Sequence, residues 1–272
     1  PFLARRFGPL PTALFAIGAV AVGPFYESFT EGRLDHHGLA ALNALLSLLF
    51  LAGGAVGWVR TDTAPTDEAA AHLWNWLPDR RRAKRWFIAA GMVGGVSLWI
   101  STASEAPVLA EIGLGALLAT GLLGRGAKKS NGARPDPSLW RVWGWSGAAA
   151  SVFFYLLEYF PSHLGMRLEV NHPLYALAWA GGGELIFRAC RWWNGGRLAE
   201  RPRDWAWLAF GLFFVAAIPA LVLIAPDKVF WINDRFLWTM HNDYIEEFFG
   251  LWRFLQSQLD NGYYMLFIIM AN

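Results

Sequence analysis

Seven long apolar stretches and the beginning of an eighth dominate this sequence of 272 residues. They lie at 10–25, 38–59, 86–104, 106–124, 142–158, 174–193 and 205–225, and the eighth begins at 263. The hydrocarbon core of a bilayer is about 30 Å thick, and a helix needs about 20 apolar residues to cross it. Only 16% of the residues are charged, which is too few to coat a soluble protein of this length. The pattern predicts an all-α, polytopic transmembrane bundle with seven full spans and a truncated eighth.

The two ends of the sequence indicate an excerpt from a longer membrane protein. The chain begins at Pro1, and its last apolar run, 263–272, would rise only about 15 Å as a helix. We therefore expect one transmembrane domain over 1–272, without a C-terminal soluble domain.

The basic residues predict the orientation of this domain. The segments that hold Arg5 and Arg6, 60–85, 125–141 and 188–203 contain 18 of the 23 Lys and Arg residues. Numbered along the predicted spans, all four segments fall on one side, which the positive-inside rule makes cytoplasmic. External loops are then expected near 26–37, 159–173 and 226–262. The run at 80–85 is interpreted as a topology signal rather than a nucleic-acid patch, so no nucleic-acid partner is expected.

Tryptophans stand at many ends of the apolar stretches, where interfacial anchors are common in membrane proteins. The residues interpreted in this way are Trp58, Trp86, Trp140, Trp143, Trp192, Trp193, Trp205 and Trp207. The triplet Gly181 to Gly183 predicts close packing between helices, because small residues let two backbones approach each other.

Most of the imidazole and carboxylate groups fall on the predicted external side. Five of the six histidines lie there, namely His36, His37, His163, His172 and His241, and so do many carboxylates, among them Glu105 and Glu158. Oxygen and imidazole ligands gathered on one face suggest a site for a divalent cation. The alternative is that these loops are simply polar.

The first candidate cluster lies where the loop 26–37 enters an apolar stretch. Asp35 and His37 are two residues apart immediately before the expected helix, so both can converge on one metal ion. The alternative is that Asp35 caps the helix and that the histidines lie at the membrane interface.

The second candidate cluster is the short loop that carries Arg167, Glu169 and His172. An arginine suits bidentate contact with the phosphate of a lipid-linked pyrophosphate. The alternative pairs Arg167 with Glu169 and lets Asn171 or His172 cap the next helix.

The third candidate is the loop 226–262, which contains six acidic residues and several aromatic ones. Loops of this length are often functional, although its middle can also form an amphipathic helix at the interface. Glu105 and Glu111 are further candidates because ionisable groups at a span are usually functional or paired. Glu184 and Arg188, four residues apart, are expected to form a structural pair.

The segment GRLDHHGLAALNALLSLLFL resembles the Asp-x-Glu or Asp-His-His element of oligosaccharyltransferase catalytic subunits of the archaeal and related bacterial type. In that family the element follows an external loop and opens a transmembrane helix. The segment RLEVNHPLYALAWAGGGEL is similar to a later loop of the family that ends in an acidic residue and a histidine. The loop 226–262 matches the family's long mobile loop, which carries a glutamate. The resemblance covers most of the chain.

The resemblance implies a GT-C type glycosyltransferase in a prokaryotic inner or plasma membrane. It would transfer a glycan from a polyprenyl phosphate or pyrophosphate carrier to a protein side chain on the extracytoplasmic face. Its partners would be the lipid-linked oligosaccharide, an acceptor polypeptide and membrane lipid. Asp35, His37 and Glu247 would bind Mg²⁺ or Mn²⁺, with Glu246 as an alternative to Glu247, and Asp35 and Glu247 would be catalytic. Arg167, Glu169 and His172 would bind substrate.

Two other functions remain open from the sequence. One is a glycosyltransferase of the same architecture that acts on a lipid or on a Ser or Thr hydroxyl. The other is a transporter in which Glu105, Glu111 and Glu184 relay ions or protons. Convergence of Asp35, His37, Glu247 and Arg167 would favour an enzyme, whereas a path of polar groups through the bundle would favour a transporter.

Overall fold

The computed structural model describes residues 8–10, 12–13, 17, 36–62, 64–65, 67–127, 132–161, 168 and 170–224. The elements with defined bounds in these ranges are seven α-helices, one 3₁₀ turn and two short strands. In order they are α4 (His36–Gly53), η1 (Ala55–Gly57), β1 (Trp58–Arg60), α5 (Glu68–Trp76), α6 (Arg80–Ile100), α7 (Thr102–Ala127), β2 (Ala133–Pro135), α8 (Ser138–Glu158), α9 (Pro173–Trp193) and α10 (Pro202–Ile224). The chain divides into two compact units, Pro1–Leu221 and Val222–Asn272, and in the second the structure describes only the last three residues of α10.

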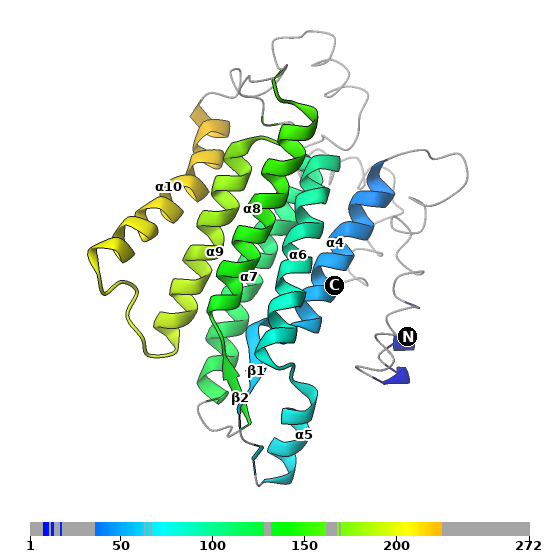
Figure 1. Cartoon of the computed structure of the whole chain (residues 1–272), viewed down its shortest axis with the longest axis vertical. Coiled ribbons are helices and arrows are strands. Elements are labelled where there is room, and N and C mark those ends of the chain that lie inside the picture. The colour runs from blue at the N-terminus through cyan, green and yellow to red at the C-terminus, as the bar shows by residue number, and fades with distance from the viewer. Residues whose placement is uncertain are drawn as a thin grey trace, which may run out of the picture. The chain divides into compact units, whose positions relative to one another are not determined.

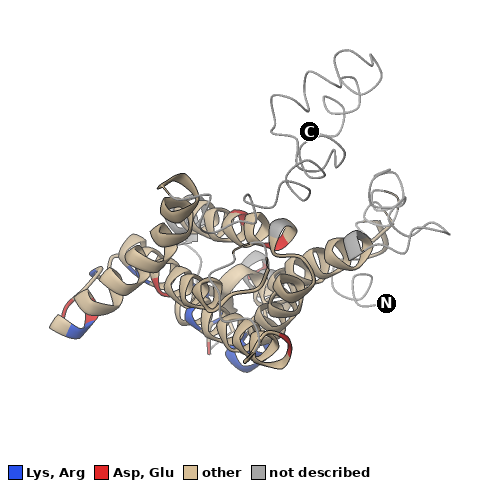
Figure 2. Ribbon diagram, turned by 90° about the horizontal axis from the view of Figure 1, so that it is seen from above, with Lys and Arg blue, Asp and Glu red and all other residues tan. Residues whose placement is uncertain are grey.

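The long helices of the first unit lie side by side and successive helices run in opposite directions (Figure 1). Helix α6 packs between α4 and α8, α8 also packs on α9, and α7 packs on α9 and α6. We call the end where α6 and α8 finish and α4, α7 and α9 begin the upper end, and the opposite end the lower end (Figure 1). Seen from above in Figure 2, charged residues are few along these helices.

Local signals set where these helices begin and end. The side chain of Asp79 caps α6 by accepting a hydrogen bond of 2.8 Å from the amide of Arg82. Helix α6 ends at Ile100, and the extended backbone of Ser101 after it starts a tight hairpin into α7. The predicted stretches 86–104 and 106–124 place this turn at residue 105, but residues 104–107 belong to the first turns of α7. Pro107 is the sixth residue of α7, where its missing amide hydrogen leaves the carbonyl of Ala103 without an intrahelical partner.

The stretch predicted as helix over 38–59 ends early. Helix α4 stops at Gly53, and Val56 has a positive φ of 50° inside η1. The chain then forms β1, which pairs antiparallel with β2 so that Val59 lies opposite Arg134. Val59 is buried, so this small sheet connects the end of α4 to the start of α8 at the lower end.

Close backbone packing joins α8 and α9, as the glycine triplet predicted. A Cβ atom on Gly183 would lie 2.7 Å from the Cα atom of Gly144, which is closer than side chains approach in folded proteins. On the other side of α9, a Cβ atom on Gly181 would lie 3.0 Å from the Cα atom of Gly211 on α10. The triplet therefore lets α9 pack against two helices at once.

The prediction of seven membrane spans and a truncated eighth is wrong. Among the described residues, one helix is long and apolar enough to cross a membrane, namely α10, with a mean hydropathy of 2.5. Helix α6 begins with basic residues, α9 carries Glu184 and Arg188 on its buried face, and the apolar part of α4 covers only Gly38–Gly53. The first predicted span, 10–25, lies mostly outside the described residues, and the eighth lies wholly outside them.

Two of the tryptophans interpreted as interfacial anchors belong to the core instead. Trp140 and Trp143 are each 2% exposed, and their rings meet edge to face at 5.9 Å between centroids. Trp143 in turn contacts Trp179 of α9. Trp192 and Trp205, in contrast, are more than half exposed, as anchors would be.

Because α8 packs closely on α9, we expect a larger residue at position 183 to destabilise the folded chain. We expect Gly183→Ala to lower the free energy of unfolding by about 1–3 kcal/mol, because the new methyl group would overlap Gly144. Gly115→Ala on α7 is the control, since its Cβ atom would meet nothing within 4 Å and alanine favours a helix by up to about 1 kcal/mol. Denaturant unfolding of both purified variants measures the difference, and equal effects would contradict this packing.

Candidate functional site

The residues predicted to form the site lie partly outside the described part of the chain. Those outside it are Asp35, Arg167, Glu169, Glu246 and Glu247. The backbone of His37 lies in the first turn of α4, and His172 is described in full. The convergence of Asp35, His37, Glu247 and Arg167 therefore stays a prediction.

The upper end of the bundle brings together several described residues that were predicted to share one side. Helix α4 begins there at His36, directly after Asp35. Glu105 lies in the first turn of α7, Glu158 is the last residue of α8, and His172 precedes α9 (Figure 1). Four separate helix ends thus place ionisable groups at this end of the bundle.

His172 is the N-cap of α9. Its Nδ1 atom accepts a hydrogen bond of 3.1 Å from the amide of Leu174, so it satisfies one of the free donors at the helix start. Burial lowers the pKa of His172, because the surrounding protein disfavours the charged ring. His172 is therefore neutral at pH 7, and the capping interpretation of this residue is confirmed.

The residues next to His172 are fixed to the neighbouring helices. The Ser151 hydroxyl of α8 donates to Asn171 Oδ1 at 2.7 Å, and Asn171 Nδ2 donates to the Ser151 carbonyl at 2.8 Å. The Tyr175 hydroxyl donates to the carbonyl of Leu168 at 2.6 Å. These buried contacts give the described part of the loop a fixed position at the upper end.

Glu158 is also held in place at the upper end. Its Oε2 atom accepts a hydrogen bond from the indole nitrogen of Trp99 on α6. The Trp99 ring stacks on Phe154 with 4.8 Å between centroids. The carboxylate of Glu158 is thus attached to both α6 and α8, while the residue itself stays exposed.

Glu105 is the most unusual acidic residue of the upper end. It is 1% exposed, and its Oε1 atom has no hydrogen-bond partner among the described residues. The side chain lies against Gly94 of α6, where a Cβ atom would be 3.1 Å from Oε1. Burial raises the pKa of Glu105 to about 7, because the charged form loses its hydration. Glu105 is therefore a carboxyl group that exchanges its proton near neutral pH.

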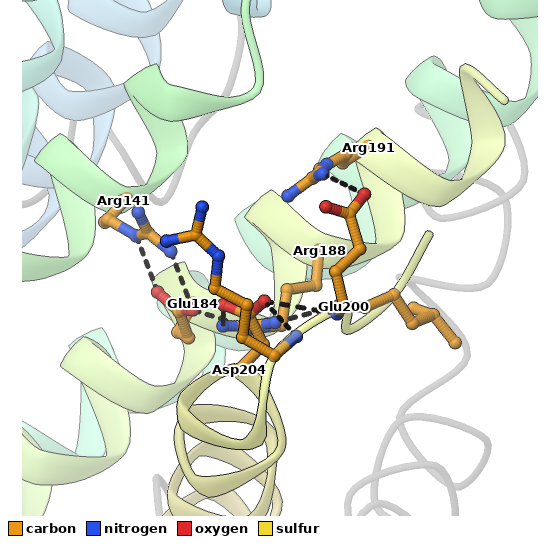
Figure 3. Close-up of polar contacts among 8 residues, drawn as sticks. Arg141, Glu184, Arg188, Arg191, Glu200 and Asp204 are labelled. Atoms are coloured by element: carbon orange, nitrogen blue, oxygen red, sulfur yellow. Dashed lines mark hydrogen bonds and ion pairs between the residues drawn. The ribbon is translucent and has the colours of Figure 1, made fainter. Parts of the chain in front are cut away.

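The lower end holds a network of charged side chains centred on Glu184 (Figure 3). Arg141 of α8 donates to both carboxylate oxygens of Glu184, at 2.6 and 2.8 Å. Arg188 donates to Glu184 from the same helix at 2.7 Å, so the predicted pair is confirmed. Glu184 and Arg188 are 3% and 1% exposed, and such burial is tolerated because both charges are paired.

Arg188 extends the network to the start of α10. It donates to the carbonyl of Leu198 at 2.8 Å and lies 3.4 Å from Asp204 Oδ1. The other oxygen of Asp204 accepts hydrogen bonds from the amides of Glu200 and Arg201. These contacts could not be predicted from the sequence, because helical spacing reveals only neighbours on one helix.

Metal binding stays a prediction from the sequence. The described residues include no group of three His, Cys, Asp or Glu side chains that would hold a metal ion. The residues named for that role, Asp35, His37 and Glu247, belong to segments or side chains that the structure does not describe.

Comparison with known proteins gives no match. No protein-family model, no curated protein and no solved structure matches this chain.

Glu105 predicts a pH-dependent stability. Its pKa is about 7 in the folded chain and near 4.5 when exposed, so the folded state binds an extra proton between these values. This contribution to stability is complete below pH 4.5 and is lost as the pH rises through 7. Relative to Glu105→Gln, the wild type should lose up to about 3 kcal/mol of its free energy of unfolding over this range.

Denaturant unfolding from acidic to neutral pH tests this prediction. Glu111→Gln is the control, since Glu111 is exposed on the same helix, and it should keep the wild-type pH dependence. If the free energies of unfolding of the wild type and of Glu105→Gln change with pH in the same way, Glu105 does not bind the extra proton of the folded state.

Proposed function

We propose that this chain is a membrane-attached glycosyltransferase of the oligosaccharyltransferase type. It would transfer a glycan from a polyprenyl phosphate or pyrophosphate carrier to a protein side chain on the extracytoplasmic face. One observation carries the proposal. Helix α4 begins immediately after Asp35, at the same end of the bundle as Glu105, Glu158 and His172.

Membrane attachment is supported by α10. This helix has the length and hydropathy to cross a bilayer, and only 6% of its apolar window is buried. Large side chains such as Leu212, Phe213 and Leu223 stand more than half exposed along it. Contact of these apolar side chains with lipid would cost no free energy, whereas their exposure to water is unfavourable.

The proposed chemistry divides the work among the residues predicted to form the site. A divalent cation held by Asp35, His37 and Glu247 would supply positive charge opposite the departing phosphate. Arg167 would hold the lipid phosphate through bidentate hydrogen bonds. His172 is neutral and already caps α9, so it would position the loop that carries Arg167 and Glu169. The loop 226–262 would close over the substrates and exclude water.

The contacts of the three glutamates argue against the transporter alternative. Glu184 is engaged by Arg141 and Arg188 at the lower end, and Glu111 is exposed on the surface of α7. Of the three, only Glu105 is buried with a carboxylate oxygen, Oε1, that has no hydrogen-bond partner among the described residues. A relay through the bundle needs polar groups that follow one another, and these three do not. Transfer to a lipid or to a hydroxyl remains a variant of the proposed activity.

The experiment compares Asp35→Ala and His37→Ala with the wild type in a glycan-transfer assay that uses a polyprenyl-pyrophosphate-linked glycan and membranes containing the chain. We expect each variant to lose transfer by at least about a hundredfold, the scale of losing an electrostatic partner of the developing charge. Tight Mn²⁺ binding, followed by electron paramagnetic resonance, should be lost in parallel. Asp62→Ala, at an exposed position, should leave both readouts unchanged.

Undiminished transfer by a folded Asp35→Ala variant would reject the assignment of this site. Loss of transfer with Mn²⁺ binding intact would show that Asp35 acts without the metal. The absence of transfer by the wild type, with this donor and a panel of acceptor peptides, would reject the proposed activity itself.

A further inference from the structure

The lower end of the bundle contains a pocket. It lies beside the Glu184 network and has a volume of about 350 Å³. Its basic lining residues are Arg141, Arg201 and Arg203, which come from α8 and from the start of α10. This volume lies within the range of pockets that bind small ligands.

The acidic residues of the pocket are already committed to protein partners. Glu184 accepts hydrogen bonds from Arg141 and Arg188, and Asp204 accepts from two backbone amides and pairs with Arg188. The pocket and the adjacent Arg188 together contain four arginines but only two carboxylates. Positive charge is therefore in excess there.

Arg201 and Arg203 supply the uncommitted part of this charge. Both are exposed, and within the described residues neither guanidinium group has a hydrogen bond or ion pair. They flank Pro202 at the first turn of α10, whose position is set by Asp204. The network thus holds two free guanidinium groups at the rim of a preformed pocket.

Two tryptophans complete the lining of the pocket. The rings of Trp145 and Trp207 meet edge to face with 6.0 Å between centroids. Trp207 stands near the start of α10, the one described helix that is apolar enough to cross a membrane. Tryptophan is enriched at the level of lipid headgroups, so the pocket lies where such a helix would enter the bilayer.

We propose that this pocket binds a phosphate group, and that the group belongs to the headgroup of an anionic lipid. Guanidinium groups match phosphate oxygens in bidentate geometry, and basic pockets at the cytoplasmic end of membrane helices bind lipid headgroups. The acyl chains would lie along the exposed apolar side chains of α10. This site is at the opposite end of the bundle from the start of α4, so it does not depend on the proposed transferase activity.

The test measures binding to the purified full-length chain in detergent by calorimetry. The probes are dioctanoyl phosphatidic acid, dioctanoyl phosphatidylcholine, inorganic phosphate and inorganic pyrophosphate. The variant Arg201→Ala with Arg203→Ala is compared with Arg81→Ala with Arg85→Ala. The second pair removes the same charge from exposed positions of α6 that do not line the pocket.

We expect phosphatidic acid to bind the wild type, and the Arg201 and Arg203 double variant to weaken binding by about tenfold or more. The Arg81 and Arg85 double variant should change the affinity less than about twofold, because screened surface charges contribute little. Circular dichroism of both variants checks that the helices are retained.

Each other outcome decides against part or all of the proposal. Equal weakening by the two double variants would show attraction to surface charge rather than a site. Binding of phosphate or pyrophosphate as tightly as phosphatidic acid would overturn the lipid as the source. Equal binding of phosphatidylcholine, or no binding of any probe, would overturn the phosphate site.

Discussion

The carboxylate of Glu184 accepts hydrogen bonds from arginines on two helices, and the arrangement of α8, α9 and the start of α10 depends on this contact. A buried carboxylate is costly unless it is paired, so Arg141 and Arg188 must both reach it when the bundle forms. Arg188 then connects to Leu198 and Asp204, which fixes the turn into α10. The same contacts fix the positions of Arg141, Glu184 and Asp204, which line the pocket at the lower end.

The positions of the long helices could be predicted from the sequence, but their relation to a membrane could not. Apolar runs with caps such as Asp79 and His172 mark helices clearly, because capping and periodicity are local. Whether an apolar helix faces lipid or protein depends on its neighbours. Trp143 shows the difficulty, since at a helix end it reads as an anchor, whereas in the structure α6, α8 and α9 enclose it.

Part of the arrangement of the candidate site could also be predicted from the sequence. Alternation along the chain correctly assigned Glu105, Glu158 and His172 to the same end of the bundle, because antiparallel helices place every second loop together. Local spacing also revealed the pair of Glu184 and Arg188. Their contacts with Arg141 and Asp204 join residues far apart in the sequence, which only the packing of three helices brings together.

The most direct test of the role of Glu184 is the change in free energy of unfolding on its replacement by alanine. We expect a loss of about 3–5 kcal/mol, because Arg188 would stay buried with only the longer contact to Asp204 to balance its charge. Glu200→Ala is the matched control, since Glu200 pairs with Arg191 at an exposed site and should cost less than about 1 kcal/mol. Similar small losses for both variants would contradict the central place given to Glu184.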